Sequence, residues 1–235
     1  MFMRVNKIDY HFSKLRYQPD FEHFTDEEFE EIKEQTVLRS YKKGQVLFDE
    51  GDERQRFYVL TEGLIRLERY DESATYYYYD YVTANNLFPI SGIFEEEPYT
   101  YTAQAMTDIE TFYFPVACYE KIVKNNPNQL IYMIQKLGKV VQMHELRIQI
   151  GLTSSAFDRV KQNLFVLKEE LGIPTEDGHI SIPYPITLKE LAVNSGTTRE
   201  TAGQVIKQLK DSGLVNYDKK RFTFCKEAVT PGWRE

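Results

Sequence analysis

Short apolar or aromatic runs recur at intervals of about ten residues between Val37 and Pro115, and they constrain the fold more than any other part of the sequence. Turn residues such as Glu50-Gly51-Asp52 and Glu62-Gly63 separate the runs. Short alternating strands at this spacing are typical of sandwiches and barrels. This part of the chain therefore predicts a barrel or jelly roll, with strands at 45–49, 57–61, 64–70, 75–82, 100–106 and 110–114.

Short helices are predicted on both sides of this β unit. Thr25 and Glu28 have the spacing of a capping box, in which each side chain accepts a hydrogen bond from the other residue's backbone. Residues 116–125 predict a second short helix, which Asn125-Asn126-Pro127 ends. Residues 1–127 are therefore interpreted as one domain.

A much longer helix is predicted from Asn128, because no proline follows until Pro174. Its apolar positions recur with alternating spacings of four and three residues, which is the heptad repeat of a coiled coil. We predict a homodimer held by a two-stranded coiled coil, and the alternative is a helix that lies on its own domain. The predicted seam consists of Leu130, Ile134, Leu137, Val141, His144 and Ile148 and ends at Gly151.

A new domain is predicted after a hinge at residues 151–155. Phe157 to Leu171 forms a second amphipathic pattern that ends at Gly172, and a proline-containing loop follows to Pro185. The expected domains are therefore 1–127, a dimerisation helix and hinge at 128–154, and a third domain at 155–235.

The third domain contains the pattern of a helix-turn-helix. Thr187 and Glu190 form another capping box, Asn194-Ser195-Gly196 supplies a sharp turn, and Thr198 caps a helix that runs to about Lys210. Residues 214–225 then predict a β-hairpin, the wing.

Charge is distributed unevenly along the chain. The formal net charge is -7, with -8 in residues 1–150 and +1 in residues 151–235. Residues 187–226 carry a local excess of +4. This segment can therefore meet a phosphate backbone although the whole chain is acidic.

The candidate DNA-binding residues lie at the N-terminus of the second helix of this motif and on the wing. Arg199 can donate two hydrogen bonds to guanine, Glu200 can accept one from cytosine, and Gln204 can pair with adenine. The remaining candidates would hold phosphates: Thr197, Thr198, Lys207, Lys219, Lys220 and Arg221. The alternative is a small helical domain with solvated charges on its outer faces.

Two stretches resemble the Crp/Fnr family of transcription regulators, and the match spans nearly the whole chain. Lys43-Gly44 through Phe48, Glu50-Gly51-Asp52, Tyr58, Gly63 and Arg66-Leu67 resemble the family's opening β-roll, and residues 196–203 resemble its recognition helix. The resemblance implies an α+β chain with an N-terminal jelly-roll β-barrel of the cyclic-nucleotide-binding type, a long dimerisation helix and a C-terminal winged helix-turn-helix. It also implies double-stranded DNA as partner, at a palindromic promoter site, with RNA polymerase as a further partner.

The chain also departs from the family pattern. Members that bind cyclic AMP carry a Gly-Glu pair and an Arg-Ser pair, and neither occurs in residues 87–102. We therefore predict no tight cyclic-nucleotide binding and an unidentified small-molecule effector. Tyr79, Phe88, Ile90 and Tyr101 are the candidate effector residues, and the tyrosine-rich strands resemble the Gram-positive branch of virulence activators and arginine-deiminase regulators.

Several other classes are not expected. The sequence has no stretch long and apolar enough for a membrane span and no signal-peptide core, so a cytoplasmic location is expected. We find no nucleophile elbow, P-loop or dinucleotide fingerprint, and we expect neither enzyme activity nor a cofactor or metal. Two alternatives stay open: a module that acts through protein contacts, and a regulator that needs no ligand.

Overall fold

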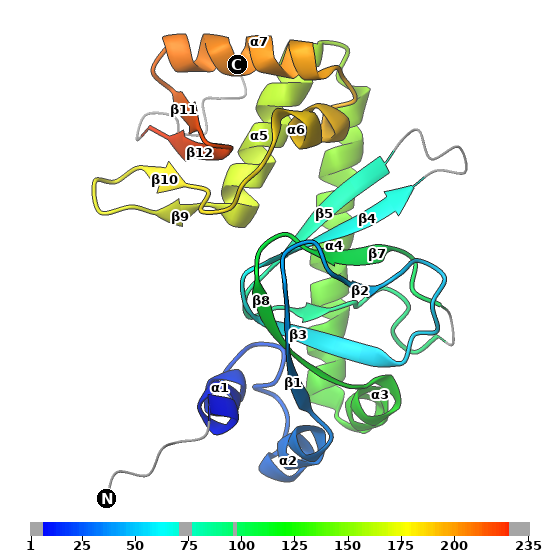
Figure 1. Ribbon diagram of the computed structural model, residues 1–235. Coiled ribbons are helices and arrows are strands. Elements are labelled where there is room, and N and C mark those ends of the chain that lie inside the picture. Colours follow the sequence, from blue (N-terminus) through cyan, green and yellow to red (C-terminus); the bar gives the residue numbers. More distant parts are fainter. Residues whose placement is uncertain (1–6, 71–76, 96–97, 226–235) are drawn as a thin grey trace, which may run out of the picture. The chain divides into compact units, whose positions relative to one another are not determined.

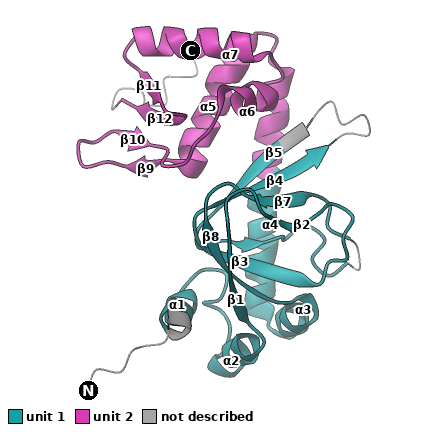
Figure 2. Ribbon diagram, in the orientation of Figure 1, with its two compact units in different colours: residues 1–70, 79–141 teal, residues 71–78, 142–235 magenta. Residues whose placement is uncertain are grey.

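The computed structural model describes residues 7–70, 77–95 and 98–225, and the chain divides into two compact units (Figure 2). The first unit comprises residues 1–70 and 79–141, and the second comprises 71–78 and 142–235. The division between Val141 and Gln142 falls within one long helix. The domain limits expected after residues 127 and 154 stay predictions.

Two four-stranded sheets form the centre of the first unit (Figure 1). Sheet A has the order β1-β8-β3-β6, and sheet B has the order β2-β7-β4-β5. The mixed α and β architecture predicted from the sequence is confirmed. The strands of sheet A are β1 (Val37–Tyr41), β3 (Arg56–Glu62), β6 (Leu87–Phe88) and β8 (Ile109–Pro115), and those of sheet B are β2 (Val46–Phe48), β4 (Leu64–Tyr70), β5 (Tyr77–Thr83) and β7 (Thr102–Ala105).

Alternation along the strands gives sheet A two apolar faces. Tyr58 lies opposite Tyr113 on one side and Phe88 on the other, and this face packs against residues of sheet B. Phe48 and Tyr99 stack there with ring centroids 3.8 Å apart. We call these buried side chains the interior cluster: Tyr41, Phe48, Tyr58, Leu60, Ile65, Val82, Phe88, Tyr99, Ala103, Ala105 and Ile109.

Helices cover the opposite face of sheet A, where Phe57, Val59 and Phe112 belong to a second apolar group, the outer cluster. Thr25 and Glu28 form the predicted capping box, with a bond of 3.2 Å from Glu28 N to Thr25 Oγ1 and one of 2.8 Å from Thr25 N to Glu28 Oε2. The helices of this layer are α1 (Lys7–Leu15), α2 (Asp26–Glu34) and α3 (Val116–Asn125), and the bounds of α3 are those predicted.

A long helix, α4 (Pro127–Leu152), is fixed to the β-roll at its start by the buried Asp20. The Asp20 carboxylate accepts hydrogen bonds from Leu87 N at 3.0 Å, Tyr132 Oη at 3.0 Å and Lys136 Nζ at 2.5 Å. Burial, together with the Asp20 charge, raises the pKa of Tyr132, so its hydroxyl stays a donor. No helix in the described part of the chain combines the length and apolar character that crossing a membrane needs.

The second unit is a winged helix-turn-helix. Helix α5 (Ala156–Leu171) begins at the N-cap Ser155, and α6 (Leu188–Asn194) and α7 (Arg199–Asp211) follow. A sheet of order β11-β12-β10-β9 completes the unit. Its strands are β9 (Ile173–Pro174), β10 (Ile180–Ser181), β11 (Val215–Asp218) and β12 (Arg221–Phe224).

The sequence patterns did not predict α1, β1, β6 or β9. Strands β6 and β9 have two residues each, which is too short for any alternation to be recognised. Strand β1 has no regular inside and outside pattern, and it exists through its pairing with β8. The strand expected at 75–82 begins at Tyr77, and residues 75 and 76 lie outside the described residues.

Candidate nucleic-acid interface

The turn between α6 and α7 has the sharp geometry expected of a helix-turn-helix. Helix α6 ends at the C-cap Ser195, and Gly196 follows with a φ of +55°. Glycine adopts this left-handed conformation without the penalty that a Cβ atom brings. Thr198 then caps α7, because its Oγ1 accepts a hydrogen bond from Thr201 N at 3.2 Å. The predicted turn and cap are confirmed.

Helix α7 divides into a buried and an exposed face. Ala202, Val205, Ile206 and Leu209 are buried in the unit. The predicted base readers and their neighbours project into solvent, and Thr197 alone among the helix candidates is half-buried. The exposed ones are Thr198, Arg199, Glu200, Gln204 and Lys207. The exposed face can therefore enter a groove without disturbing the core.

Glu200 is ionised at the N-terminus of α7. Backbone N–H donation and the Thr198 hydroxyl lower the pKa of its carboxyl group, and Arg199 contributes in the same direction. A carboxylate is an acceptor only, so Glu200 can take a hydrogen bond from a cytosine amino group but can give none.

The wing presents its basic residues from a strained two-residue turn. Asp218 pairs with Arg221 across the hairpin, and Lys219 and Lys220 between them have φ values of +47° and +66°. Positive φ at both positions is the geometry of a type I′ turn, which prefers Asn-Gly. Lys219, Lys220 and Arg221 are exposed. Cationic side chains therefore occupy the tip although other residues suit the backbone better.

A capping variant tests how α6 is held. Thr187 Oγ1 accepts from Glu190 N at 3.1 Å, and Glu190 Oε2 accepts from Thr187 N at 2.7 Å. Replacing Thr187 with Ala removes the cap and is expected to lower the free energy of unfolding by about 1 kcal/mol. Urea denaturation followed by far-UV circular dichroism measures the change. Thr187→Ser retains the hydroxyl, so its free energy of unfolding should stay within a few tenths of a kcal/mol of wild type. Equal losses of stability in both variants would refute the capping explanation.

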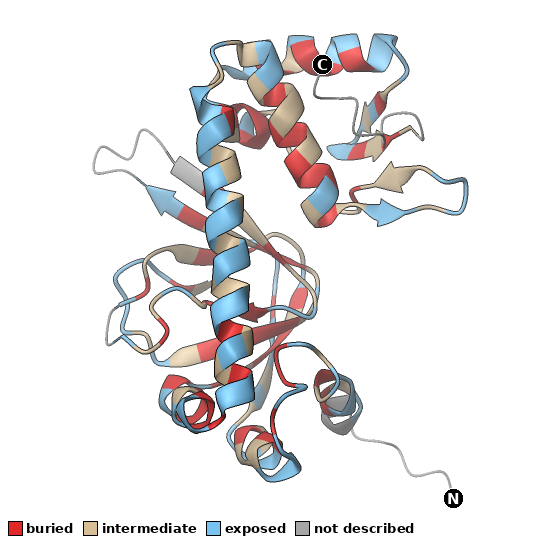
Figure 3. Cartoon of the chain, turned by 180° about the vertical axis from the view of Figure 1, so that it is seen from behind, coloured by how far each residue is buried: buried red, intermediate tan, exposed pale blue. Residues whose placement is uncertain are grey.

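The predicted dimer seam divides into two groups on α4 (Figure 3). Ile134, Val141 and Ile148 have exposed fractions of 61%, 55% and 63%. Leu130 and Leu137 are instead partly buried and pack against the outer cluster. His144 is exposed but lies on the edge nearer to them.

The exposed apolar residues of α4 form a heptad stripe of their own that the sequence analysis did not identify. Ile131 and Leu152 have exposed fractions of 54% and 80% and share a helix face with Ile134, Val141 and Ile148. The spacing from Ile131 to Leu152 also follows the repeat of three and four residues, so the sequence contains this second heptad pattern beside that of the predicted seam. We call these residues the α4 stripe: Ile131, Ile134, Gly138, Val141, Glu145, Ile148 and Leu152.

The four candidate effector residues do not lie together. Phe88 belongs to the interior cluster and Tyr101 packs against it, whereas Ile90 packs against the outer cluster. Tyr79 stacks with Arg66, whose Cζ lies 4.5 Å from the ring centroid. Since Ile65 and Leu67 face the interior cluster, Arg66 and Tyr79 lie on the other face of sheet B. The structure therefore places the four candidates in different parts of the first unit and does not bring them together.

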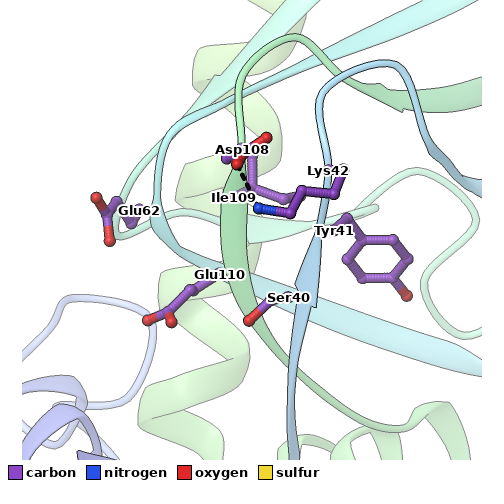
Figure 4. A pocket seen from close by; sticks show the side chains of 7 residues that line it. All are labelled: Ser40, Tyr41, Lys42, Glu62, Asp108, Ile109 and Glu110. Carbon is purple, nitrogen blue, oxygen red and sulfur yellow. Dashed lines mark hydrogen bonds and ion pairs between the residues drawn. The ribbon is translucent and has the colours of Figure 1, made fainter.

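A separate pocket of about 260 Å³ opens near the ends of β1 and β8 (Figure 4). Lys42 Nζ lies 2.7 Å from Asp108 Oδ2 there, and this bond raises the pKa of Lys42 and lowers that of Asp108. Its lining contains none of the predicted effector residues: Ser40, Tyr41, Lys42, Glu62, Asp108, Ile109 and Glu110.

The two units each match a known family model. Residues 38–126 match the cyclic nucleotide-binding domain, and residues 159–228 match the Crp-like helix-turn-helix domain. The second match contains the turn, α7 and the wing.

Known proteins resemble the chain over most of its length. The HTH-type transcriptional regulator ArcR of Staphylococcus aureus is 28% identical over 224 residues, which cover 95% of this chain and 93% of that protein. A solved CRP/FNR-family transcriptional regulator from Thermus thermophilus is 26% identical, with a TM-score of 0.64, and covers 85% of this chain and 99% of that one.

A third protein shares the fold at lower identity. FixK2 from Bradyrhizobium japonicum is 15% identical with a TM-score of 0.70, and the match covers 82% of this chain and 94% of that one. The sensor-type β-roll, the long helix and the Crp-like helix-turn-helix occur in the same order in one chain, with regulators among its relatives. The chain therefore belongs to the Crp/Fnr family of DNA-binding transcription regulators.

Proposed function

We propose that this regulator acts as a homodimer that reads a palindromic promoter site with two copies of α7. The observation that carries the proposal is the exposed polar N-terminus of α7 beside a wing whose tip carries three basic residues. Arg199, Glu200 and Gln204 contact base edges in the major groove, because these side chains match the donors and acceptors found there. Lys207 and the wing residues contact phosphates.

A second copy of the chain is proposed to cover the α4 stripe. Five of the seven stripe positions carry exposed Ile, Val or Leu side chains, with Gly138 and Glu145 between them at the same heptad spacing, and an identical helix can bury such a pattern. A two-fold dimer then presents its recognition helices to half-sites about one helical turn, or 34 Å, apart. Leu130, Leu137 and His144 support the helix from its flank rather than forming the seam itself.

The β-roll is proposed to respond to a small molecule other than cyclic AMP, and RNA polymerase is the proposed partner at the promoter. Aromatic side chains that stack on one another fill the interior cluster. An arginine does contact the segment where family members bind the cyclic phosphate, but Arg54 Nη2 lies 2.8 Å from Glu120 Oε1 and 2.5 Å from Glu95 O. Glu120 also accepts from Phe94 N at 2.9 Å, so this carboxylate already pairs with the Arg54 charge, although Arg54 Nε and Nη1 are buried without a hydrogen-bond partner among the described residues.

Calorimetric titration tests the proposed lack of cyclic-nucleotide binding. Because Arg54 is already paired with Glu120, a cyclic phosphate would have to compete with that carboxylate for charge-assisted hydrogen bonds. We expect no binding heat and a shift in Tm below about 1 °C at 1 mM cyclic AMP, a concentration at which a ligand with Kd near 10 μM would stabilise the fold by about 2.7 kcal/mol. A Kd below about 100 μM would contradict the proposal, since such a ligand would still stabilise it measurably.

The wing is tested by exchanging its strained lysines for residues that suit the turn. Lys219→Asn with Lys220→Gly removes two charges and relieves left-handed strain of roughly 1 kcal/mol or more per residue. We expect Tm to rise. We also expect the slope of log Kd against log salt, measured on duplex DNA of arbitrary sequence, to fall by about 2 per wing, because each phosphate contact contributes about 0.9.

Removing a lysine elsewhere separates local contact from net charge. Lys43 is exposed in the turn before β2, so Lys43→Asn removes a positive charge from the unit that does not contain the wing. The slope of log Kd against log salt for Lys43→Asn should equal that of wild type. If the wing variant kept the wild-type slope, the wing would not contact DNA phosphates.

A further inference from the structure

Arg159 connects the end of α4 to the turn of the helix-turn-helix through four hydrogen bonds to main-chain oxygens. Its Nη1 donates to Thr153 O at 2.7 Å and to Ser154 O at 3.0 Å. Its Nε donates to Ser195 O at 2.8 Å, and its Nη2 donates to Gly196 O at 3.1 Å. All five residues belong to the second unit.

These acceptors lie just beyond the C-termini of two helices. Helix α4 ends at Leu152 and α6 ends at Asn194. Carbonyl groups at helix C-termini lack intrahelical partners and carry the negative end of the helix dipole. One guanidinium group therefore places its positive charge beside two helix C-termini and donates to the carbonyl groups just beyond them, which the single ammonium group of a lysine cannot do in this fork geometry.

The position of Arg159 in its own helix supports a role outside that helix. It lies in the first turn of α5, where a positive charge faces the unfavourable end of the dipole. Its contacts instead run to the neighbouring helix ends. A second tie links the same elements, since Arg147 Nη2 lies 2.8 Å and 3.0 Å from the two carboxylate oxygens of Glu170.

We infer that Arg159 is a positioning residue for DNA recognition. It fixes the orientation of the recognition helix α7 relative to the C-terminal half of the dimer helix α4. Residues 151–155 then act as a braced corner and not as the flexible hinge expected from the sequence. Because Gly196 lies two residues before Thr198, the cap of α7, the spacing between the two recognition helices is set by how the α4 helices pair. This inference rests on the proposed dimer and on its palindromic site.

The DNA test measures how strictly the distance between half-sites is enforced. The probe is the palindrome that wild-type protein selects from a random DNA pool, remade with one or two base pairs added to or removed from its centre. Wild type is expected to lose on the order of 10²-fold in affinity when two base pairs are added, because the second half-site can no longer be engaged together with the first. Arg159→Lys keeps the charge, and its affinity is expected to vary less than about threefold across the series. It should still bind two half-sites more tightly than one.

A distance measurement tests the brace without DNA. Nitroxide labels at Gln149→Cys and Gln208→Cys, in a chain with Cys118→Ala and Cys225→Ala, report the distance between α4 and α7, and dilution with unlabelled chain isolates distances within one protomer. We expect one narrow distribution in the wild-type background and a broad one with Arg159→Lys. Lys161→Met, two residues further along α5, loses one charge and should retain both the narrow distribution and the spacing preference.

The outcomes separate this inference from the proposed function. The inference would be overturned if Arg159→Lys matched wild type in both its dependence on half-site spacing and its distance distribution. This holds whatever the absolute affinity of the variant for DNA. Failure of wild type to select any palindrome would instead contradict the proposed function, and the distance distribution would still decide whether Arg159 braces the corner. Circular dichroism of each variant distinguishes a lost brace from a lost fold.

Discussion

Replacing Arg199 and Glu200 together with Ala is expected to abolish sequence-specific DNA binding. Both side chains are exposed at the N-terminus of α7, where such residues reach base edges. Each base contact contributes about 1–3 kcal/mol, and a dimer makes every contact twice. Affinity for the selected palindrome should fall at least about 10³-fold, to the level of non-specific DNA. Fluorescence anisotropy with specific and scrambled duplexes measures both values.

The matched control lies further along the same helix. Gln208 is exposed on α7, and Gln208→Ala should bind the palindrome within threefold of wild type. Non-specific binding of the double variant should survive, because Lys207 and the wing are unchanged. If the double variant still bound the palindrome and controlled its promoter, α7 would not read the bases. If instead the double variant lost specific DNA binding but still controlled the promoter, the winged helix would be a protein-binding surface, as the alternative from the sequence holds.

Charges placed on the α4 stripe are expected to dissociate the dimer. Val141→Glu with Ile148→Glu puts four carboxylates into a two-stranded seam, where apolar side chains must pack. Light scattering should give a mass near 27.7 kDa in place of twice that value. Affinity for the palindrome should fall by about 10²–10⁴, because the two half-sites are then bound independently.

A charge-matched variant on the other side of the helix isolates the seam. Lys139 is exposed on α4 outside the stripe, and Lys139→Glu changes the charge of the chain as much as the two stripe substitutions do. It should remain dimeric with unchanged affinity. A dimeric Val141→Glu, Ile148→Glu variant would place the dimer interface elsewhere and return α4 to the alternative of a helix that lies on its own domain.

Local chemistry made much of the second unit predictable. Thr187, Glu190 and Thr198 mark helix starts through hydrogen bonds within three residues, and Gly196 marks a turn that other residues enter at a cost. Those features need no knowledge of the rest of the chain. Strand β6 is different, because its two residues become a strand only by pairing with Tyr58 and Val59.

Long-range packing limited the prediction of the dimer seam and of the effector residues. Two heptad repeats share Ile134, Val141 and Ile148, and the packing of Leu130 and Leu137 against the outer cluster distinguishes them. In the same way, alternation along β5 says that its tyrosines divide between the two faces of the sheet but not which of them face inward. The stack of Tyr79 on Arg66 decides that point. Arg159 gave no signal, since an arginine in an amphipathic helix is ordinarily a solvated charge.

Selection of bound sequences from a random DNA pool tests the central claim most directly. The purified protein would be used without added ligand and at near-physiological salt, and light scattering would establish that it is a dimer. The account predicts enrichment of a palindrome whose half-sites lie about one helical turn apart. Enrichment of a single unpaired half-site by an intact dimer would contradict it.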